Sequence, residues 1–214
     1  MDTPYERYLR LPALLSLQDP RTPRDGRERW ADEHFFIVVH QSAELLVRQA
    51  LIDLGTALEH AGAHRVPETC SSLRRVTALV EALDRHLALL DHLDPADFAD
   101  FRPLLEGASG AQSPQFATLF ELVEEHGGAF FRHGPDTGGA AGTSTAPGEE
   151  PRGSEDPREP ASSWRALHNA VTRWRVRHLL MVERMIGEEA GTGGTTGLEY
   201  LRARIDLPPR RPSA

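Results

Sequence analysis

A stripe of aliphatic residues at helical spacing constrains the fold more than any other feature of this sequence. The stripe consists of Leu73, Val76, Leu79, Val80, Leu83, Leu87, Leu90 and Leu93, which recur at steps of three and four residues. This spacing places the side chains on one face of a helix, and such a face is stable only when it packs on a core. The segment therefore predicts a long amphipathic helix.

Similar patterns predict three more helices and no strand. Their ranges are 31–60, 114–125 and 162–187. Ser162 or Ser163 is expected to cap the last of these helices, and Gly187 to end it. Strict alternation of apolar and polar residues, bounded by turn signals, is the mark of a strand, and we find it nowhere. The sequence predicts an all-α fold, a bundle of helices.

Length and composition fit one domain that spans residues 1–214, with 39% hydrophobic residues available for a single core. Residues 132–161 are rich in Gly, Pro, Ser, Thr and acids, so we expect a disordered insert there. No uninterrupted apolar run approaches the roughly 20 residues of a membrane-spanning helix, and no signal-peptide pattern follows the N-terminus. We therefore expect a cytoplasmic protein that does not bind a membrane.

Charge and residue usage exclude several functional classes. The formal net charge of -8 argues against a nucleic-acid partner. All 24 basic residues are arginine, so chemistry that needs a lysine amine is absent, including pyridoxal phosphate enzymes, class I aldolases and Walker NTPases. Cys70 is the only cysteine, which excludes an internal disulfide and a cysteine-based zinc or iron–sulfur site.

Most of the ten histidines are not expected to bind a metal. His60 and His64 flank Gly62, which indicates a helix end rather than a metal-binding pair. The histidines expected on the surface or in loops are His86, His92, His126 and His133. The Glu-x-x-His pattern of di-iron bundles does not occur.

His40 and His178 differ from the others because each lies in an apolar helical stretch. Residues three or four apart share a helix face, so Phe36 lies beside His40. By the same spacing, Trp174 and Met181 lie beside His178. Taken singly, each is best interpreted as a hydrogen-bonded core histidine. Taken together, on separate helices, they could face opposite sides of a flat apolar cofactor such as haem.

Two further features are candidate binding elements for an anion. The glycine-rich run GTGGTTG at 191–197 could bind a carboxylate through backbone N–H groups and threonine hydroxyls, or it could be a plain helix connection. It follows a helix and contains no lysine, which argues against a phosphate loop. Arg102 lies among phenylalanine and leucine residues and could hold a carboxylate by two parallel hydrogen bonds, or form a surface ion pair.

Four blocks of the sequence, in this order, resemble the tryptophan 2,3-dioxygenase family. They are YERYLRLPALLSLQ near the N-terminus, HFFIVVHQSAEL at 34–45, DFADFRPLLEGASGAQSPQF at 97–116 and WRVRHLLMVERMIGEEAGTGGTTGLEYLR at 174–202. The last block is the most specific, and residues 117–161 are not covered. The resemblance implies an α-helical haem enzyme, usually a homotetramer, that adds O2 across C2–C3 of the indole of L-tryptophan.

The resemblance also implies a haem site, with haem b as cofactor and O2 as co-substrate. His178 matches the proximal ligand of the haem iron. Trp174 shares its helix face and is expected to contact the cofactor. Ser109 matches a serine on the distal side of the haem.

The implied substrate site uses residues from both ends of the chain. His40 matches the distal histidine that hydrogen-bonds the indole N–H, and Phe36 matches an aromatic wall. Arg102 matches the carboxylate clamp, and Thr192 matches the loop residue that helps to hold the amino-acid group. Tyr5 and Tyr8 match an N-terminal segment that completes the pocket of the neighbouring subunit, so we expect a homotetramer or homodimer with exchanged arms.

Several departures from the family pattern affect the expected reaction. Ala111 stands where the family typically has Phe in ASGFQS, Phe98 where it has Tyr, and Leu46 where it has Trp. The 132–161 segment also replaces a helical insert. These changes suggest a relative in secondary metabolism that acts on a substituted tryptophan such as β-methyltryptophan. Three outcomes stay open: dioxygenation to an N-formylkynurenine, monooxygenation to a 2-oxindole, and a non-catalytic haem or indole sensor.

Overall fold

The computed structural model describes residues 2–25, 27–132, 159–187 and 197–205, which form helices and turns and no strand. The predicted all-α class is thereby confirmed. The elements are α1 (Pro4–Leu9), α2 (Leu11–Leu14), α3 (Arg27–Gly62), α4 (Val66–Leu87), η1 (Ala88–His92), α5 (Pro95–Phe101), η2 (Arg102–Leu105), η3 (Gly110–Gln112), α6 (Pro114–Arg132), α7 (Glu159–Ile186) and α8 (Leu198–Arg202).

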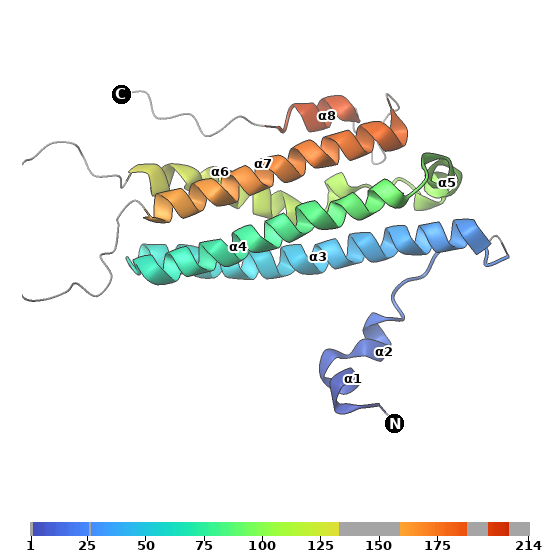
Figure 1. Ribbon diagram of the computed structural model, residues 1–214, viewed down its shortest axis with the longest axis horizontal. Helices are drawn as coiled ribbons and strands as arrows, with labels where there is room; N and C mark the ends of the chain where they lie inside the picture. The colour runs from blue at the N-terminus through green and yellow to red at the C-terminus, as the bar shows by residue number, and fades with distance from the viewer. Residues whose placement is uncertain (1, 26, 133–158, 188–196, 206–214) are drawn as a thin grey trace, which may run out of the picture.

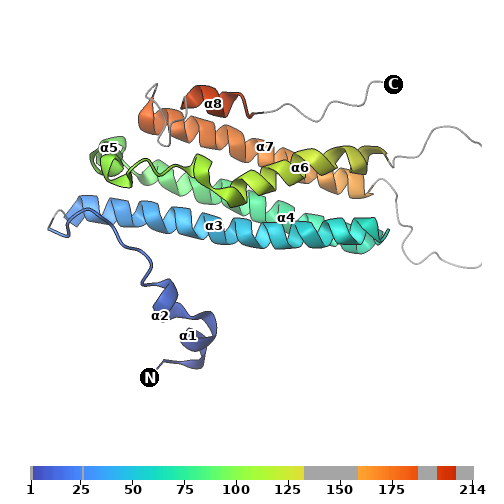
Figure 2. The same ribbon diagram turned by 180° about the vertical axis from the view of Figure 1, so that it is seen from behind.

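The long helices α3, α4, α6 and α7 run side by side as a bundle (Figure 1). The most extensive packing is between α3 and α4 and between α4 and α7, while α6 packs on both α3 and α7. Figure 2 views the bundle from behind, and there α6 lies in front of part of α7. The short elements α5 and α8 lie at the same end of the bundle.

The aliphatic stripe continues beyond the end of its α-helix. The α-helical part of the stripe ends at Leu87, and the tighter turn η1 follows at once. Leu90 and Leu93 are nevertheless buried, so they keep facing the core after the change of helix type. The predicted stripe therefore faces the core along its length, with Leu79 half-buried and the other members buried.

Helix ends differ from the predictions more than helix positions do. α7 begins at Glu159, so the serine cap was wrong: Ser162 lies inside the first turn, where its Oγ donates to Glu159 O (2.8 Å). Pro160 explains this earlier start because proline fits the first turn of a helix. α6 likewise continues past 125 to Arg132. Gly187 has φ 58°, a left-handed conformation that ends α7 as predicted.

Both ends of the predicted 132–161 insert belong to helices. Arg132 is the last residue of α6, and residues 159–161 belong to α7. Its remaining residues, 133–158, lie outside the described part of the chain.

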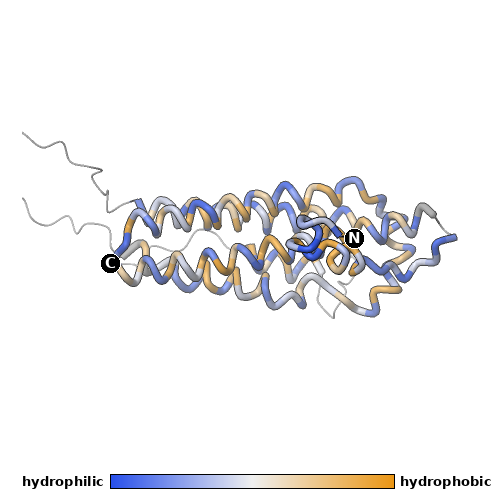
Figure 3. Tube along the Cα trace, turned by 90° about the horizontal axis from the view of Figure 1, so that it is seen from below, coloured by the Kyte–Doolittle hydropathy of each residue, from blue (hydrophilic) through white to orange (hydrophobic). Residues whose placement is uncertain are grey.

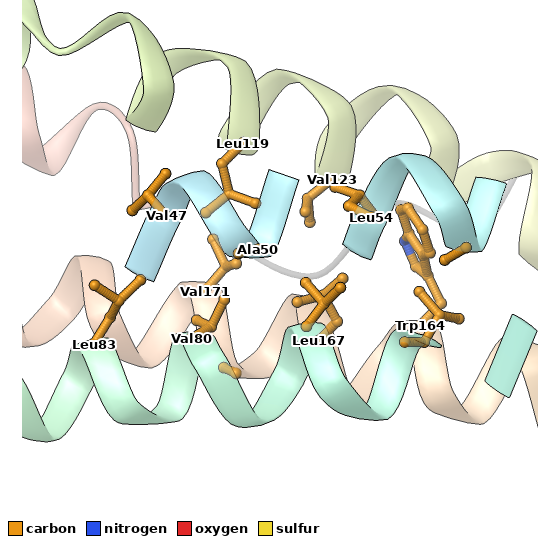
Figure 4. Close-up of a cluster of buried hydrophobic side chains, with 14 residues drawn as sticks. Val47, Ala50, Leu54, Val80, Leu83, Leu119, Val123, Trp164, Leu167 and Val171 are labelled. Atoms are coloured by element: carbon orange, nitrogen blue, oxygen red, sulfur yellow. The ribbon is translucent and has the colours of Figure 1, made fainter. Parts of the chain in front are cut away.

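The main core is a cluster of buried side chains contributed by α3, α4, α6 and α7 (Figure 4). Trp164 is fully buried and stacks on Phe130, with ring centroids 4.4 Å apart. Leu54, Leu119 and Leu167 belong to the same cluster. A second, smaller cluster lies at the α5 end, where Phe98 and Phe101 pack with leucines of α4 and η1.

The N-terminal arm, α1 and α2, stands away from the bundle (Figures 1 and 2). Thr3 and Glu6 form a reciprocal capping box that starts α1. Tyr5 and Tyr8 are largely exposed, with 68% and 87% of their surface accessible. The arm is therefore ordered locally but does not bury its aromatic side chains against its own chain.

The expectation that no segment is long and apolar enough to span a membrane is corrected by helix α3. Its Arg29–Gly62 part is long and apolar enough to cross a membrane by length and composition. Apolar and polar residues are interspersed along the long helices (Figure 3). In the bundle, Val47, Ala50 and Leu54 of α3 belong to the main core, while Leu45 and Ile52 are exposed. The helix is thus a core element that also keeps apolar side chains on its outer face.

Candidate functional site

A cavity of about 520 Å³ opens among the helices at the α5 end of the bundle. Most of its lining is apolar, chiefly leucine, phenylalanine, alanine, methionine and valine, and histidine, arginine, glutamate and serine side chains supply the polar part. The sequence-predicted site residues that line it are Phe36, His40, Arg102, Ser109, Trp174 and His178. An apolar cavity of this size with a few polar groups is the usual form of a ligand site.

His40 enters the cavity from α3 in a fixed orientation. Its Nδ1 lies 2.7 Å from Phe36 O, one helical turn earlier. A carbonyl oxygen can only accept, so Nδ1–H is the donor and the neutral ring keeps a lone pair on Nε2. Burial lowers the pKa of His40, which favours this neutral form. The ring also packs on Phe36, with centroids 4.0 Å apart.

His178 enters the same cavity from α7. Its ring stacks on Trp174 at 5.0 Å and 10°, and Trp174 in turn stacks on Phe116 of α6 at 4.8 Å. Burial, together with the nearby His40, lowers the pKa of His178 to about 4. The imidazole is therefore neutral near pH 7 and has a lone pair available for a metal ion.

Arg102 is brought to the cavity by the buried end of α5. Asp94 caps this helix, its carboxylate accepting from Ala96 N at 2.7 Å. Phe98 and Phe101 are buried and pack edge to face, and each lies 5.6 Å from the ring of Phe36. The chain then enters η2 with Arg102 as its first residue. These contacts fix the end of α5, from which Arg102 follows and lines the cavity.

Ser109 starts the short turn η3 and has a local structural role. Its Oγ accepts from Ala111 N at 3.3 Å, and Gln112 completes a capping box with it. Ala111 lines the cavity, as does Phe98, whereas Leu46 packs on the main core. Of the three departures from the family pattern, two therefore alter the lining of the cavity.

His86 does not lie where the sequence pattern predicts. This histidine lies on α4 and lines the cavity, so its assignment to the surface or a loop was wrong. Its Nε2 lies 2.9 Å from Ser42 Oγ and 3.0 Å from Val39 O, which ties α4 to α3 within one turn of His40. The signal was present in the sequence, because His86 lies between Leu83 and Leu90 of the aliphatic stripe. His126, expected outside a helix or on the surface, is half-buried within α6.

A polar rim of the cavity was also missed. Arg175 of α7 pairs with Glu124 (2.5 Å), donates to Arg204 O (3.0 Å) and packs over the ring of Phe120. Its Nε is buried and has no hydrogen-bond partner within the described part of the chain. At the other side of α6, Gln115 donates to the carboxylate of Glu44 (2.7 Å), which joins α6 to α3.

Three predicted substrate residues are not placed at this cavity. Tyr5 and Tyr8 lie on the arm and do not line it. Thr192 lies outside the described residues. Among the described side chains, no group of three or more His, Cys, Asp and Glu residues is arranged to hold a bare metal ion.

Comparison with known proteins assigns the family. The sequence profile described as tryptophan 2,3-dioxygenase matches residues 1–127 and 149–208. A tryptophan 2,3-dioxygenase of Anaeromyxobacter sp. (strain K) is 29% identical over 247 aligned positions, which cover 95% of this chain and 91% of that protein. One of Burkholderia multivorans (strain ATCC 17616 / 249) is 28% identical, covering 95% of this chain and 79% of the relative. The chain thus belongs to the tryptophan 2,3-dioxygenase family of haem-dependent enzymes.

Proposed function

We propose that this protein binds haem b and uses O2 to oxidise the indole of L-tryptophan, or of a substituted tryptophan, at C2–C3. The observation that carries this proposal is the placement of His40 and His178 on different helices around one apolar cavity that Arg102 also lines. In dioxygenation both atoms of O2 enter the product, and the C2–C3 bond is broken to give an N-formylkynurenine. The substrate supplies all the electrons that reduce O2, so no external reductant is consumed.

The cavity residues fit a haem. The porphyrin supplies the other nitrogen ligands of the iron, so the single neutral imidazole of His178 is a sufficient protein ligand. The apolar lining suits the faces of the macrocycle. The buried, unpartnered Nε–H of Arg175 is a donor that would suit an acidic side chain of the cofactor. When bound, haem supplies the activation of O2, while the protein supplies binding, orientation and electrostatics.

The remaining site residues fit the amino-acid substrate. Arg102 would hold the carboxylate through paired, charge-assisted hydrogen bonds. His40 would accept a hydrogen bond from the indole N–H at Nε2, because its Nδ1–H is committed to Phe36 O. Phe36 and Phe98, whose rings are in contact, would pack against the indole from one side and exclude water. These contacts would fix the indole at one place and angle, which is how positioning lowers a reaction barrier. Thr192 would add a contact to the amino-acid group.

A second reaction is favoured by the altered lining. Ala111 and Phe98 line the cavity. Relative to the family pattern, the side chain at 111 is smaller and the phenolic hydroxyl at 98 is missing. This change favours a substituted substrate such as β-methyltryptophan and an oxygenation in secondary metabolism that stops at a 2-oxindole. That outcome places one oxygen atom in the product and reduces the other to water, so it requires an external two-electron reductant.

Assembly into a homotetramer, or a homodimer, in the cytoplasm completes the proposal. Val38, Leu45 and Ile52 are exposed and lie seven residues apart along α3, so they form an apolar line that another subunit could cover. Tyr5 and Tyr8 are exposed on the arm and available to reach a neighbouring subunit. Exchange of arms would then complete each cavity in trans.

Product analysis tests the function directly. The haem-loaded protein is reduced with dithionite without oxygen, excess dithionite is removed, and tryptophan or β-methyltryptophan is added, followed by O2, in parallel samples with and without ascorbate as the external reductant. Mass spectrometry of the product then distinguishes the reactions: a gain of two oxygen atoms indicates cleavage, and a gain of one indicates the oxindole. Absence of O2 consumption with every tryptophan analogue would overturn both and favour a sensor.

A further inference from the structure

The chain between the arm and α3, residues 15–25, is fastened to α3 at two places, and we call it the connector. At the first place, Gln41 Nε2 donates to Leu17 O (3.0 Å), and Gln18 Nε2 donates to Gln41 Oε1 (2.6 Å). At the second place, Glu33 binds the far end of the connector. Gln41 directly follows His40, so the connector passes close to the wall that carries the distal histidine.

Glu33 is a buried anchor for the connector, with only 2% of its surface accessible. Its carboxylate accepts from the backbone N–H of Arg21 (2.9 Å) and of Thr22 (2.7 Å), and also from the hydroxyl of Thr22. A buried carboxylate is tolerated when such donors replace its water. The backbone of Arg21 is therefore held at a fixed place relative to α3.

From this fixed backbone, the side chain of Arg21 reaches the turn that begins with Arg102. Its Nη1 donates to Leu104 O (2.9 Å) and pairs with the carboxylate of Glu106 (2.8 Å). Leu104 belongs to η2, whose first residue is Arg102. One guanidinium thus binds both the body of this short turn and the residue that ends it.

The end of η2 has an unfavourable backbone conformation, so a contact from another part of the chain can determine its position. Glu106 has φ 51°, a left-handed conformation that is unfavourable for a residue with a side chain, and Gly107 follows with φ 82°. These two residues reverse the chain directly after η2. A four-residue turn followed by an unfavourable conformation has little intrinsic stability, so contacts from outside help to determine where it lies.

We propose that Arg21 is a positioning residue for substrate binding: it holds η2 in place so that Arg102 faces the bound carboxylate. This inference rests on the proposed function, because it requires Arg102 to be the carboxylate clamp. Since the connector also carries the arm, the same contacts link the position of the arm to the position of the clamp.

The test is the binding of two ligands to the haem-loaded protein by calorimetry without oxygen. L-Tryptophan carries the carboxylate and tryptamine lacks it. Arg21→Ala should weaken tryptophan binding about three- to tenfold, the effect of losing one hydrogen-bonded contact, and should leave tryptamine binding unchanged. Arg21→Lys keeps a donor for Leu104 O and should restore most of the loss. In turnover, KM for tryptophan should rise while kcat stays within about twofold.

Arg74→Ala is the matched control. Arg74 pairs with Glu159 at 3.2 Å, and its side chain is 62% exposed, against 55% for Arg21, but its partner lies on α7 and not at the η2 turn. Haem content and thermal midpoint should be equal in the two variants. Equal weakening of tryptophan and tryptamine binding by Arg21→Ala, or no difference from Arg74→Ala, would overturn the inference.

A double substitution separates this inference from the proposed function. If Arg21 acts through Arg102, then Arg21→Ala should have no further effect on tryptophan binding in the Arg102→Ala background. A full additional loss in that background would show that Arg21 acts by another route. If Arg102→Ala itself leaves the preference for tryptophan over tryptamine unchanged, the clamp assignment fails and this inference fails with it. If Arg102→Ala removes that preference and Arg21→Ala has no effect, only this inference fails.

Discussion

The imidazole of His178 is held in one orientation and is neutral, as a ligand of haem iron would need to be. Trp174 stacks on its ring, and burial lowers its pKa to about 4, so the imidazole stays neutral. We expect His178→Ala to purify with little haem or with a displaced Soret band, because the iron would lose its protein ligand. Absorbance spectra and a pyridine haemochrome assay measure this. A variant with the haem content and spectrum of the unmodified protein would contradict the assignment.

Arg102 is the residue proposed to bind the substrate carboxylate, and its substitution tests the substrate part of the site. Removing one partner of a charge pair in a desolvated pocket typically costs about 2 to 5 kcal/mol. We therefore expect Arg102→Ala to weaken tryptophan binding by orders of magnitude while haem content stays unchanged. Titration of the haem-loaded variant with tryptophan provides the measurement. Equal saturation of the unmodified protein by tryptamine and by tryptophan would argue against a carboxylate clamp.

At the level of single residues, the sequence predicted the groups that lie on strongly apolar helical faces. His40 and His178 belong to this class, and the structure places both at the cavity. His86 belongs to it too, but it directly follows the charged residues Asp84 and Arg85, and only its three- and four-residue spacing to Leu83 and Leu90 indicates which face of the helix it occupies. Arg175 could not be predicted, because its contacts to Glu124 and Arg204 join segments that only the tertiary fold brings together.

At the level of elements, the order and type of the long helices followed from periodicity, whereas their ends did not. Apolar spacing specifies which residues face the core, but a helix end depends on which local hydrogen bonds compete. α7 shows this, since Ser162 bonds backward within the helix instead of capping it. The conversion of α4 into η1 was likewise not predicted, although the stripe passes through it without interruption.

Two adjacent leucines of η1 provide a direct test of that continuity. Leu90 is 2% exposed and packs beside the cavity, while Leu89 is 39% exposed. We expect Leu90→Ala to lower the free energy of unfolding by about 2 to 5 kcal/mol through lost burial and a residual cavity. Leu89→Ala is the matched control and should change it by less than about 1 kcal/mol. Urea unfolding of both variants measures this, and equal losses would contradict the assigned register of the stripe.

The segment from 133 to 158 is predicted to be dispensable for folding. It contains almost no apolar side chains, so it has little burial to offset the conformational entropy of ordering it. Replacing it with a short Gly/Ser linker should leave the thermal midpoint and the haem content nearly unchanged. Differential scanning calorimetry and haem absorbance report the two quantities. A large fall in either would mean that the segment packs on the bundle.

At the level of the whole molecule, the single chain leaves apolar surface on two parts that a subunit contact would cover. α3 exposes Val38, Leu45 and Ile52, and the arm exposes Tyr5 and Tyr8. The sequence indicated the arm only through family resemblance, and the line on α3 was not predicted, because helical periodicity alone does not tell a core-facing side from a subunit-facing side.

The arm of one subunit is expected to complete the cavity of a neighbouring subunit. Deleting residues 1–10 should reduce substrate affinity more than haem content, because the proposed haem contacts come from helices of the bundle. If arms cross between subunits, mixing the inactive Arg102→Ala protein with the inactive truncated protein should restore part of the activity, since the cavity of each truncated subunit keeps an intact clamp and gains an intact arm. Light scattering must first show an oligomer, and a labelled subunit must show that exchange has occurred. No recovery after demonstrated exchange would mean that each arm serves its own chain, and a fully active monomer would exclude the arrangement altogether.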